Sequence, residues 1–222
     1  MMLQYPDPET CLARSQFIDS DAPEIVEVVQ RLTTADQTPA EKAVILFNYV
    51  RDNVEYEFTI RNTPNEFKAS FTLGDGRGFC VRKSLLVAAL CRAAGIPSVI
   101  ILCNMKDMSI SPRVVEMLGT DIMYNHGLAG VHLEGHWYQL DASLSPELVA
   151  KRQFRLVEFD GQSDALQENT TMTGDPHMEY VAYHGAYIDL PYKQMMQGFD
   201  KGYANANKEE LAKMGWHSTF DI

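Results

Sequence analysis

Long hydrophobic runs are missing from this sequence. The longest uninterrupted apolar stretches, at positions 85–91 and 99–103, fall far short of the roughly 20 residues that a bilayer-spanning helix needs. The first residues also lack the basic and apolar regions of a secretory signal, so we expect no signal peptide. The sequence therefore predicts a cytoplasmic protein that does not bind a membrane.

Basic residues and cysteines are scarce as well. Nineteen Lys and Arg residues stand against thirty Asp and Glu residues, which gives a net charge of −11 at pH 7. This balance argues against a nucleic-acid partner, because such binding depends on cations that neutralise phosphates. The four cysteines, at positions 11, 80, 91 and 103, contain no CxxC pair, which excludes a dense disulfide framework and makes a structural zinc site improbable.

What the sequence does contain is the composition of an ordinary globular protein. Its 222 residues are 45% hydrophobic and 22% charged, and a chain of this length buries roughly 70% of its unfolded surface. There is no internal repeat, low-complexity tract or linker. We therefore expect one domain over residues 1–222, with a core at about 40–145 and a C-terminal elaboration at 146–222 that could cover a cleft. The oligomeric state is left open.

The hydrophobic pattern predicts helices first and strands later. Thr38 and Glu41 form a capping box at the start of a helix that should run to about Val54. The stretch after Phe79 is a nearly all-apolar helix that Gly95 ends, so we expect it inside the protein. The other expected elements are a helix at 24–32, a loop at 61–78, a buried strand at 98–103, a hairpin at 126–143, strands at 155–159 and 178–188, and a short helix at 191–199. The 22 residues between 103 and 126 leave room for a small insertion.

Cys80 lies where a glycine-rich loop meets the first turn of the apolar helix. The free N–H groups and the positive end of the helix dipole at such a position favour a thiolate over a thiol. Gly76 and Gly78 allow the backbone to approach closely and leave space for an acyl group. Cys80 is therefore the candidate nucleophile.

The hairpin supplies a candidate base and its partner. A two-residue turn at Glu134-Gly135 places Leu128 opposite Asp141, and His126 is then a diagonal neighbour of Asp141 on the same face. At this distance an imidazole can hydrogen-bond a carboxylate. A thiol, a histidine and a carboxylate in this order make the nucleophile, base and orienting group of acyl-transfer catalysis.

These segments resemble a known family. Gly78-Phe79-Cys80, followed by residues 84–98, resembles the cysteine-helix motif of the transglutaminase-like superfamily, and residues 126–143 resemble that family's histidine-to-aspartate hairpin. The resemblance implies a catalytic triad of Cys80, His126 and Asp141, with the backbone N–H of Cys80 in the oxyanion hole. It leaves the second oxyanion donor unassigned.

The fold that the resemblance implies is α/β (α+β): a cysteine-protease fold with N-terminal helices and a central cysteine helix packed on an antiparallel sheet. One departure from the family is that Gly127 and Leu128 follow His126, where an aromatic residue is common. Residues 77–80 also resemble arylamine N-acetyltransferases, a sister family with the same triad.

The implied function is thiol-dependent acyl transfer. Cys80 would form an acyl-enzyme from a peptide, another amide, an ester or an acyl-thioester, and pass the acyl group to water or to an amine. A protease, an amidase and an amide-forming acyltransferase all remain open, and no cofactor is expected; calcium dependence is not predicted, since no DxDxDG loop occurs. The alternative function is a catalytically silent protein of the same fold that binds peptides or serves as a scaffold.

Other reactive side chains receive simpler interpretations. His126, His132, His136 and Asp141 suggest a metal site, but strand geometry places His132 about 20 Å from His126 and points His136 to the opposite face. We expect inert core positions for Cys91 and Cys103, and surface or structural roles for His177 and His184. The tyrosines at 180, 183, 187 and 192 are interpreted as packing residues.

Overall fold

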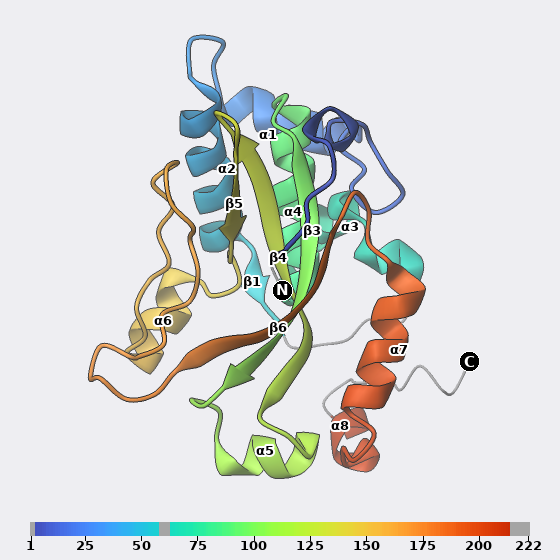
Figure 1. Cartoon of the computed structure of the whole chain (residues 1–222), viewed down its shortest axis with the longest axis vertical. Helices are drawn as coiled ribbons and strands as arrows, with labels where there is room; N and C mark the ends of the chain where they lie inside the picture. The colour runs from blue at the N-terminus through green and yellow to red at the C-terminus, as the bar shows by residue number, and fades with distance from the viewer. Residues whose placement is uncertain (1–2, 58–62, 214–222) are drawn as a thin grey trace.

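A four-stranded antiparallel sheet lies at the centre of the computed structural model, which describes residues 3–57 and 63–213 (Figure 1). The strand order is β5-β4-β3-β6. The strands are β3 (Ser98–Asp107), β4 (Ile122–Leu133), β5 (His136–Leu140) and β6 (Met178–Tyr187). Helices precede, separate and follow these strands, so the expected α/β (α+β) class is confirmed.

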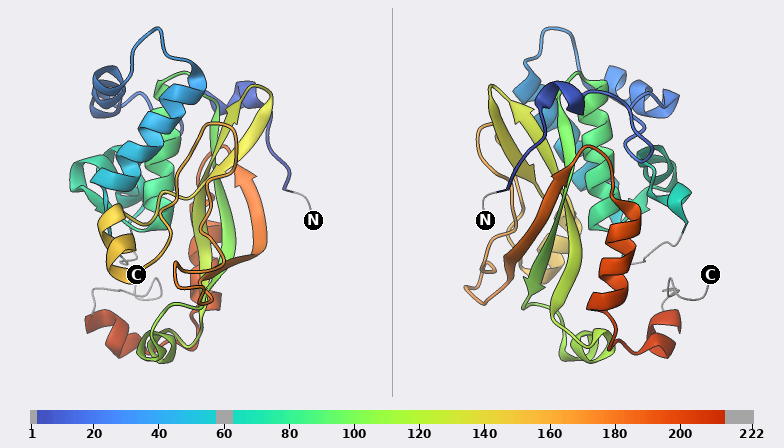
Figure 2. Two further views of the ribbon diagram at one scale, coloured as in Figure 1. Left: turned by 90° about the vertical axis from the view of Figure 1, so that its left-hand side faces the viewer. Right: turned by 45° about the vertical axis from the view of Figure 1, so that its right-hand side comes forward.

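Helix α4 (Cys80–Ala93) packs on one face of the sheet, against β3 and β4. Every residue from Cys80 to Arg92 is buried, as its nearly all-apolar sequence predicts. Three more helices cover the side of α4 that faces away from the sheet (Figure 2). They are α1 (Pro23–Leu32), α2 (Pro39–Asn53) and α3 (Ala69–Asp75). The residues described contain no helix with the length and apolar content needed to cross a membrane.

The opposite face of the sheet is covered by the N-terminal segment. Val99 and Ile101 of β3 form an apolar cluster there with Cys11 of η1 (Pro8–Cys11). Tyr5 stacks on Trp137 of β5, with 4.9 Å between the ring centroids. Strand β3 is therefore buried on both faces, which explains why its first half is a continuous apolar run.

Two local predictions are confirmed in detail. The Thr38 side chain accepts a hydrogen bond from the Glu41 N–H, and the Glu41 carboxylate accepts one from the Thr38 N–H. The hairpin turns at Glu134 and Gly135, whose φ angles of 49° and 85° are those of a type I′ turn. Leu133 is paired with His136.

The expectation of a loop at 61–78 is wrong for residues 63–78. Residues 61 and 62 lie outside the described ranges. This stretch contains a 3₁₀ turn, η2 (Pro64–Phe67), the helix α3, and the short strand β2 (Arg77–Gly78), which pairs in parallel with β1 (Glu55–Tyr56). The many loop-forming residues mark element ends: Gly76 ends α3 with a φ of 70°.

The expected strand at 155–159 is also wrong. Its alternating apolar residues are buried against α2 and not within a sheet: Phe159 packs on Phe47 with ring centroids 6.0 Å apart. The backbone carbonyl of Val157 accepts a hydrogen bond from the Arg51 side chain (2.7 Å) in place of a strand partner. Alternation along a chain thus reflects one-sided burial, which an extended segment can achieve without strand pairing.

The expected strand at 178–188 and helix at 191–199 are confirmed as β6 and α7 (Tyr192–Gly202). The segment between β3 and β4 contains a short helix, α5 (Pro112–Leu118), which starts at the cap residue Ser111. Two further helices are α6 (Pro146–Arg152) and α8 (Lys208–Lys213). The N–H of Asn207 donates to the carbonyl of Met117 (2.8 Å), which joins the C-terminal part to α5.

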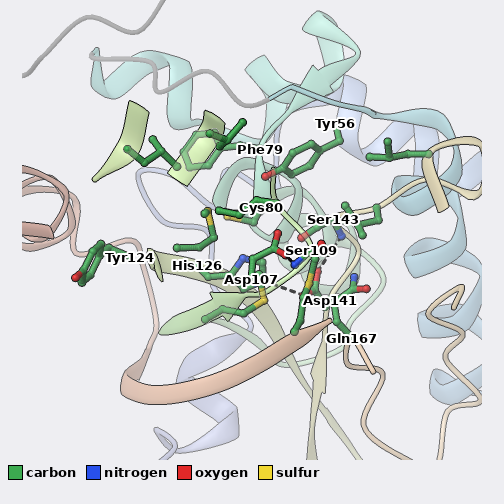
Figure 3. Close-up of a pocket in the computed structure, with 18 of the residues that line it drawn as sticks. Tyr56, Phe79, Cys80, Asp107, Ser109, Tyr124, His126, Asp141, Ser143 and Gln167 are labelled. Carbon is green, nitrogen blue, oxygen red and sulfur yellow. Dashed lines mark hydrogen bonds and ion pairs between the residues drawn. The ribbon is translucent and has the colours of Figure 1, made fainter. Parts of the chain in front are cut away.

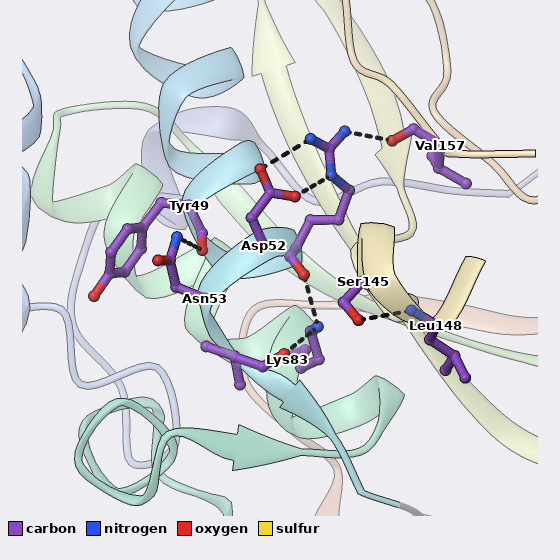
Figure 4. A network of polar contacts seen from close by, with 9 residues as sticks. Tyr49, Asp52, Asn53, Lys83, Ser145, Leu148 and Val157 are labelled. Carbon is purple, nitrogen blue, oxygen red and sulfur yellow. Dashed lines mark hydrogen bonds and ion pairs between the residues drawn. The ribbon is translucent and has the colours of Figure 1, made fainter. Parts of the chain in front are cut away.

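A buried lysine joins α4 to the end of α2 (Figure 4). Lys83 Nζ donates to the carbonyls of Val54 (2.6 Å) and Arg51 (3.3 Å), which α2 leaves without helical partners. Burial lowers the pKa of Lys83 to about 7, against the opposing effects of Asp141 and Asp52. The folded protein therefore releases a proton from Lys83 that the unfolded chain retains until much higher pH.

Exchange of Lys83 for Met is expected to change how stability depends on pH. Between pH 7 and 9 the unfolded wild-type chain binds more protons at this position than the folded one, so the free energy of unfolding rises with pH, by up to about 1.4 kcal/mol per pH unit. Lys83→Met lacks this contribution. Urea denaturation of both proteins from pH 6 to 9 measures this contribution. Plots of unfolding free energy against pH that run parallel for the two proteins would contradict the prediction. The exposed Lys151→Met is the control.

Candidate active site

Cys80 is the first residue of α4, and its side chain is 8% exposed. The residue before it, Phe79, provides no side-chain cap for the helix. The first N–H groups of α4 are therefore not occupied by a capping side chain and can bind a negatively charged oxygen. The expected placement of Cys80 at a helix N-terminus is confirmed.

His126 lies in β4 next to an irregularity in the sheet. It is paired with Cys103, and the register between β3 and β4 shifts directly beyond this pair. The preceding residue, Asn125, has a φ of 50°, and its side chain donates to the carbonyl of Met195 (3.1 Å) while its N–H donates to Asn104 Oδ1 (3.2 Å). Such bulges bend a strand and redirect a side chain. Here the bulge sets the direction of His126.

Gly127 explains how α4 comes close enough to β4. A Cβ atom at this position would lie 2.6 Å from the Cα of Val81, so only glycine fits. Ser84 Oγ donates to the Gly127 carbonyl (2.9 Å) and fixes the contact. Gly127, which departs from the family pattern, is thus the residue at which α4 packs closely against β4.

Gly127→Ala is expected to lower both stability and activity. The contact is with backbone, so helix and strand must move apart, which costs about 1–3 kcal/mol and separates Cys80 from His126. Urea denaturation and the rate of ester hydrolysis measure the two effects. Gly74→Ala is the matched control, because its Cβ would meet no atom within 4 Å; an effect of Gly127→Ala no larger than that of the control would contradict the prediction.

Asp141 directly follows β5 and is a diagonal neighbour of His126, as the hairpin register predicts. The distance from His126 Nε2 to Asp141 Oδ2 is 2.8 Å, and the two side chains are 4% and 0% exposed. The Ser143 N–H donates to Asp141 Oδ1 (3.0 Å). The other imidazole nitrogen, Nδ1, remains for Cys80, which interacts electrostatically with the His126 side chain. The structure thus brings all three residues expected from the sequence together.

The charges of Asp141 and His126 stabilise one another, and the charge of Cys80 also acts on His126. Burial opposes the charged form of His126, but the negative charges of Cys80 and Asp141 outweigh it and raise the pKa of His126 well above its usual value. Burial also opposes ionisation of Asp141, yet His126 and the hydrogen bonds from Ser143 and Tyr180 lower the pKa of Asp141 to about 2. An ionised Asp141 beside a charged imidazole is the arrangement that favours a thiolate.

Tyr180 is a site residue that the sequence analysis missed. The sequence predicts a packing role for Tyr180, but its hydroxyl donates to Asp141 Oδ2 (2.7 Å) and accepts a hydrogen bond from the Gln167 N–H (3.0 Å). Burial and Asp141 raise the pKa of Tyr180 well above its usual value, so it remains a donor. The other three tyrosines make no contact with Asp141 among the described hydrogen bonds.

Tyr56 is a second residue that the sequence did not reveal. Pairing of β1 with β2 places it beside Gly78, two residues before Cys80. Its hydroxyl points towards Cys80 (Figure 3), and burial together with the charge of Cys80 raises the pKa of Tyr56 well above its usual value. A neutral hydroxyl in this position can donate to an oxyanion next to the thiol.

Cys80, His126 and Asp141 line one cavity of about 270 Å³ (Figure 3). It extends from the start of α4 towards α5, and α6 and α7 contribute to its walls. Phe154 and Gln167, which follow the hairpin in the sequence, lie in the same walls. A substrate that reaches the thiol must enter this cavity.

The remaining histidines and cysteines lie away from this cavity. His132 packs on Trp137 (5.2 Å between centroids), and His136 is exposed at the hairpin turn. His177 is buried against Phe154, and the exposed His184 hydrogen-bonds Asn104. Within residues 3–57 and 63–213 no three metal-ligating side chains form a group.

Cys91 and Cys103 are free thiols in the core, where burial raises their pKa values. A raised pKa keeps a thiol protonated and slows its reaction with electrophiles. Their environment thus differs from that of Cys80, which faces a cavity.

Comparison with known proteins places the chain in a family. The sequence model of the transglutaminase-like superfamily matches residues 26–142, more than half of the chain. None of the curated proteins is similar enough in sequence to count as a match.

Three solved structures are similar in part. A provisionally named cysteine protease from Cytophaga hutchinsonii has 18% identity and a TM-score of 0.49, with 81% of this chain and 57% of that chain covered. A provisionally named protease from Parabacteroides distasonis has 16% identity and a TM-score of 0.39, with 75% and 32% covered. The arylamine N-acetyltransferase from Mycobacterium abscessus has 16% identity and a TM-score of 0.39, with 60% and 46% covered. The chain thus spans between about a third and about three fifths of these proteins.

Proposed function

Because the chain belongs to the transglutaminase-like superfamily, we propose that it is an enzyme that transfers acyl groups through the thiolate of Cys80. The observation that carries the proposal is the position of His126, which hydrogen-bonds Asp141 through Nε2 and contacts Cys80 on its other side. A silent binding protein would not need a buried imidazole between a carboxylate and a thiol that lines a cavity.

The proposed reaction has two steps. The Cys80 thiolate attacks the carbonyl carbon of an amide, ester or thioester, and the resulting oxyanion accepts hydrogen bonds from the Cys80 N–H and the Tyr56 hydroxyl. The protonated His126 gives its proton to the leaving amine, alcohol or thiol as the bond to that group breaks. Water or an amine, deprotonated by His126, then attacks the acyl-enzyme and releases the thiolate. Asp141 keeps the imidazole oriented throughout.

The proposed substrates are peptides, other amides, esters and acyl-thioesters, with water or an amine as acceptor. Nucleophile, base and oxyanion donors all come from this chain, so the proposed reaction requires no cofactor or metal ion. We propose the cytoplasm as its location, where a catalytic thiol stays reduced.

Trapping the acyl-enzyme tests the proposal. The protein is mixed with 4-nitrophenyl acetate, quenched in acid and digested, and the acetyl group is located by mass spectrometry. We expect it on Cys80, with a burst of 4-nitrophenol before steady turnover. Iodoacetamide at about pH 6.5 should likewise label Cys80 well ahead of Cys91 and Cys103. Equal labelling of all three thiols in the folded protein would favour the alternative, a silent binding protein.

A further inference from the structure

The part of the cavity that lies towards α5 is apolar and rich in methionine. Met105, Met117, Met123 and Met178 line it, from β3, α5, β4 and β6 respectively. Methionine side chains are flexible and polarisable, so they adapt to unbranched apolar groups. An apolar cavity of about 150 Å³ can bind benzene, so the volume of about 270 Å³ has room for a longer group.

Gln167 provides a polar contact in the wall of the same cavity. It is 4% exposed, and neither its Oε1 nor its Nε2 atom has a hydrogen-bond partner among the described residues. Its backbone is fixed, because its N–H donates to the Tyr180 hydroxyl (3.0 Å), which in turn donates to Asp141. A buried amide without partners carries a free-energy penalty, and a ligand in the cavity can relieve it. Figure 3 shows Gln167 among the residues that line the cavity.

The chemistry of Gln167 selects the kind of group that it can bind. A carboxamide both donates and accepts hydrogen bonds, so it matches an amide, which offers an N–H and a carbonyl. A carboxylate is disfavoured, because the buried carboxylates of Asp107 and Asp141 line the same cavity, whereas the cationic lining residue Arg152 is exposed to solvent, which screens its charge. The suitable ligand is therefore neutral.

We propose that this cavity binds peptide-like acyl donors, in which an amide that hydrogen-bonds Gln167 is next to a long, neutral, apolar side chain that fills the methionine-lined part. The inference rests on the proposed function, since it names the substrate class of that site. Gln167 and Met178 follow the part of the chain that matches the family, which ends at residue 142, whereas Met105, Met117 and Met123 lie within it, so the proposed selectivity depends on both parts of the chain.

Four activated esters test the proposal by kcat/KM. N-acetyl-L-norleucine 4-nitrophenyl ester has both features; 4-nitrophenyl hexanoate lacks the amide, N-acetylglycine 4-nitrophenyl ester lacks the chain, and the α-ester of N-acetyl-L-glutamate has an anionic chain. We expect the norleucine ester to exceed each of the others by about tenfold or more, in line with one hydrogen bond or a few buried methylene groups. Gln167→Met should remove the advantage over the hexanoate, whereas the exposed Gln30→Met should keep it.

Two further measurements separate this proposal from the proposed function. A purely structural Gln167 predicts a lower Tm for Gln167→Met, whereas we expect an equal or higher Tm because an unpartnered amide is removed. Binding of the unreactive N-acetyl-L-norleucine methylamide to Cys80→Ala protein, measured by calorimetry, involves no reaction at residue 80. Its affinity should fall about tenfold when Gln167→Met is added to the Cys80→Ala protein.

The outcomes are distinguishable. If the esters acylate Cys80 at equal rates, or Gln167→Met leaves their ratios unchanged, the substrate class is overturned and the acyl-transfer function stands. If no ester acylates Cys80 but the methylamide binds through Gln167, the function fails and the binding site stands. Absence of both acylation and binding overturns both.

Discussion

Cys80→Ala should lose essentially all turnover and keep its fold. The proposed reaction has no other nucleophile, and removal of the nucleophile of a catalytic triad costs roughly 10⁶-fold in kcat in the best-studied case. Alanine has high helix propensity and fits at the first position of α4 without strain. Hydrolysis of 4-nitrophenyl esters and circular dichroism of the same samples measure activity and fold.

The matched controls are Cys91→Ala and Cys103→Ala. Both thiols are fully buried away from the cavity, so their removal should lower stability modestly and leave the rate near that of the wild type. A folded Cys80→Ala protein with wild-type activity would exclude the covalent mechanism.

Replacement of His126 should have the second largest effect. His126→Ala removes general acid–base catalysis, a factor of about 10²–10⁴ or more. Asp141→Asn should cost less, because asparagine retains an oxygen for His126 and Tyr180, and a thiol ionises more readily than a hydroxyl. His132→Ala and His136→Ala should stay within a few-fold of wild type. Inactivation by His132→Ala together with a fully active His126→Ala would show that a different histidine is the base.

The pH profile distinguishes the roles of these two residues. Asp141, with a pKa of about 2, remains ionised at every working pH, so it should not produce the acidic limb of kcat/KM. The raised pKa of His126 keeps the imidazolium present well above pH 6.5. Activity should therefore decline in the alkaline range, as His126 loses its proton. In Asp141→Asn this limb should move to lower pH, and an unchanged limb would contradict the role of Asp141.

Local patterns predicted much of this structure. The capping box of Thr38 and Glu41 and the turn at Glu134-Gly135 depend on residues within a few positions of one another, and both are confirmed. The turn alone fixes the hairpin register, so it also fixes the approach of His126 to Asp141 before any tertiary contact is known.

Contacts between distant segments could not be predicted in the same way. Tyr180 reaches Asp141 across 39 positions, and Tyr56 reaches Cys80 through a two-residue ladder that is too short to leave a pattern. The apolar alternation at 155–159 comes from packing on α2, a helix about a hundred positions earlier. Periodicity reports which side of a segment is buried, but it does not report what buries it.

The hydrogen bond from Tyr180 to Asp141 determines where a shortened chain that keeps the candidate site can end. A fragment that stops near residue 145 contains Cys80, His126 and Asp141, but it lacks β6 and with it the Tyr180 hydroxyl. It would also leave β3 as an unprotected edge strand, whose free N–H and carbonyl groups invite pairing between molecules and aggregation. Expression trials of shortened versions should therefore retain the chain at least through Tyr187.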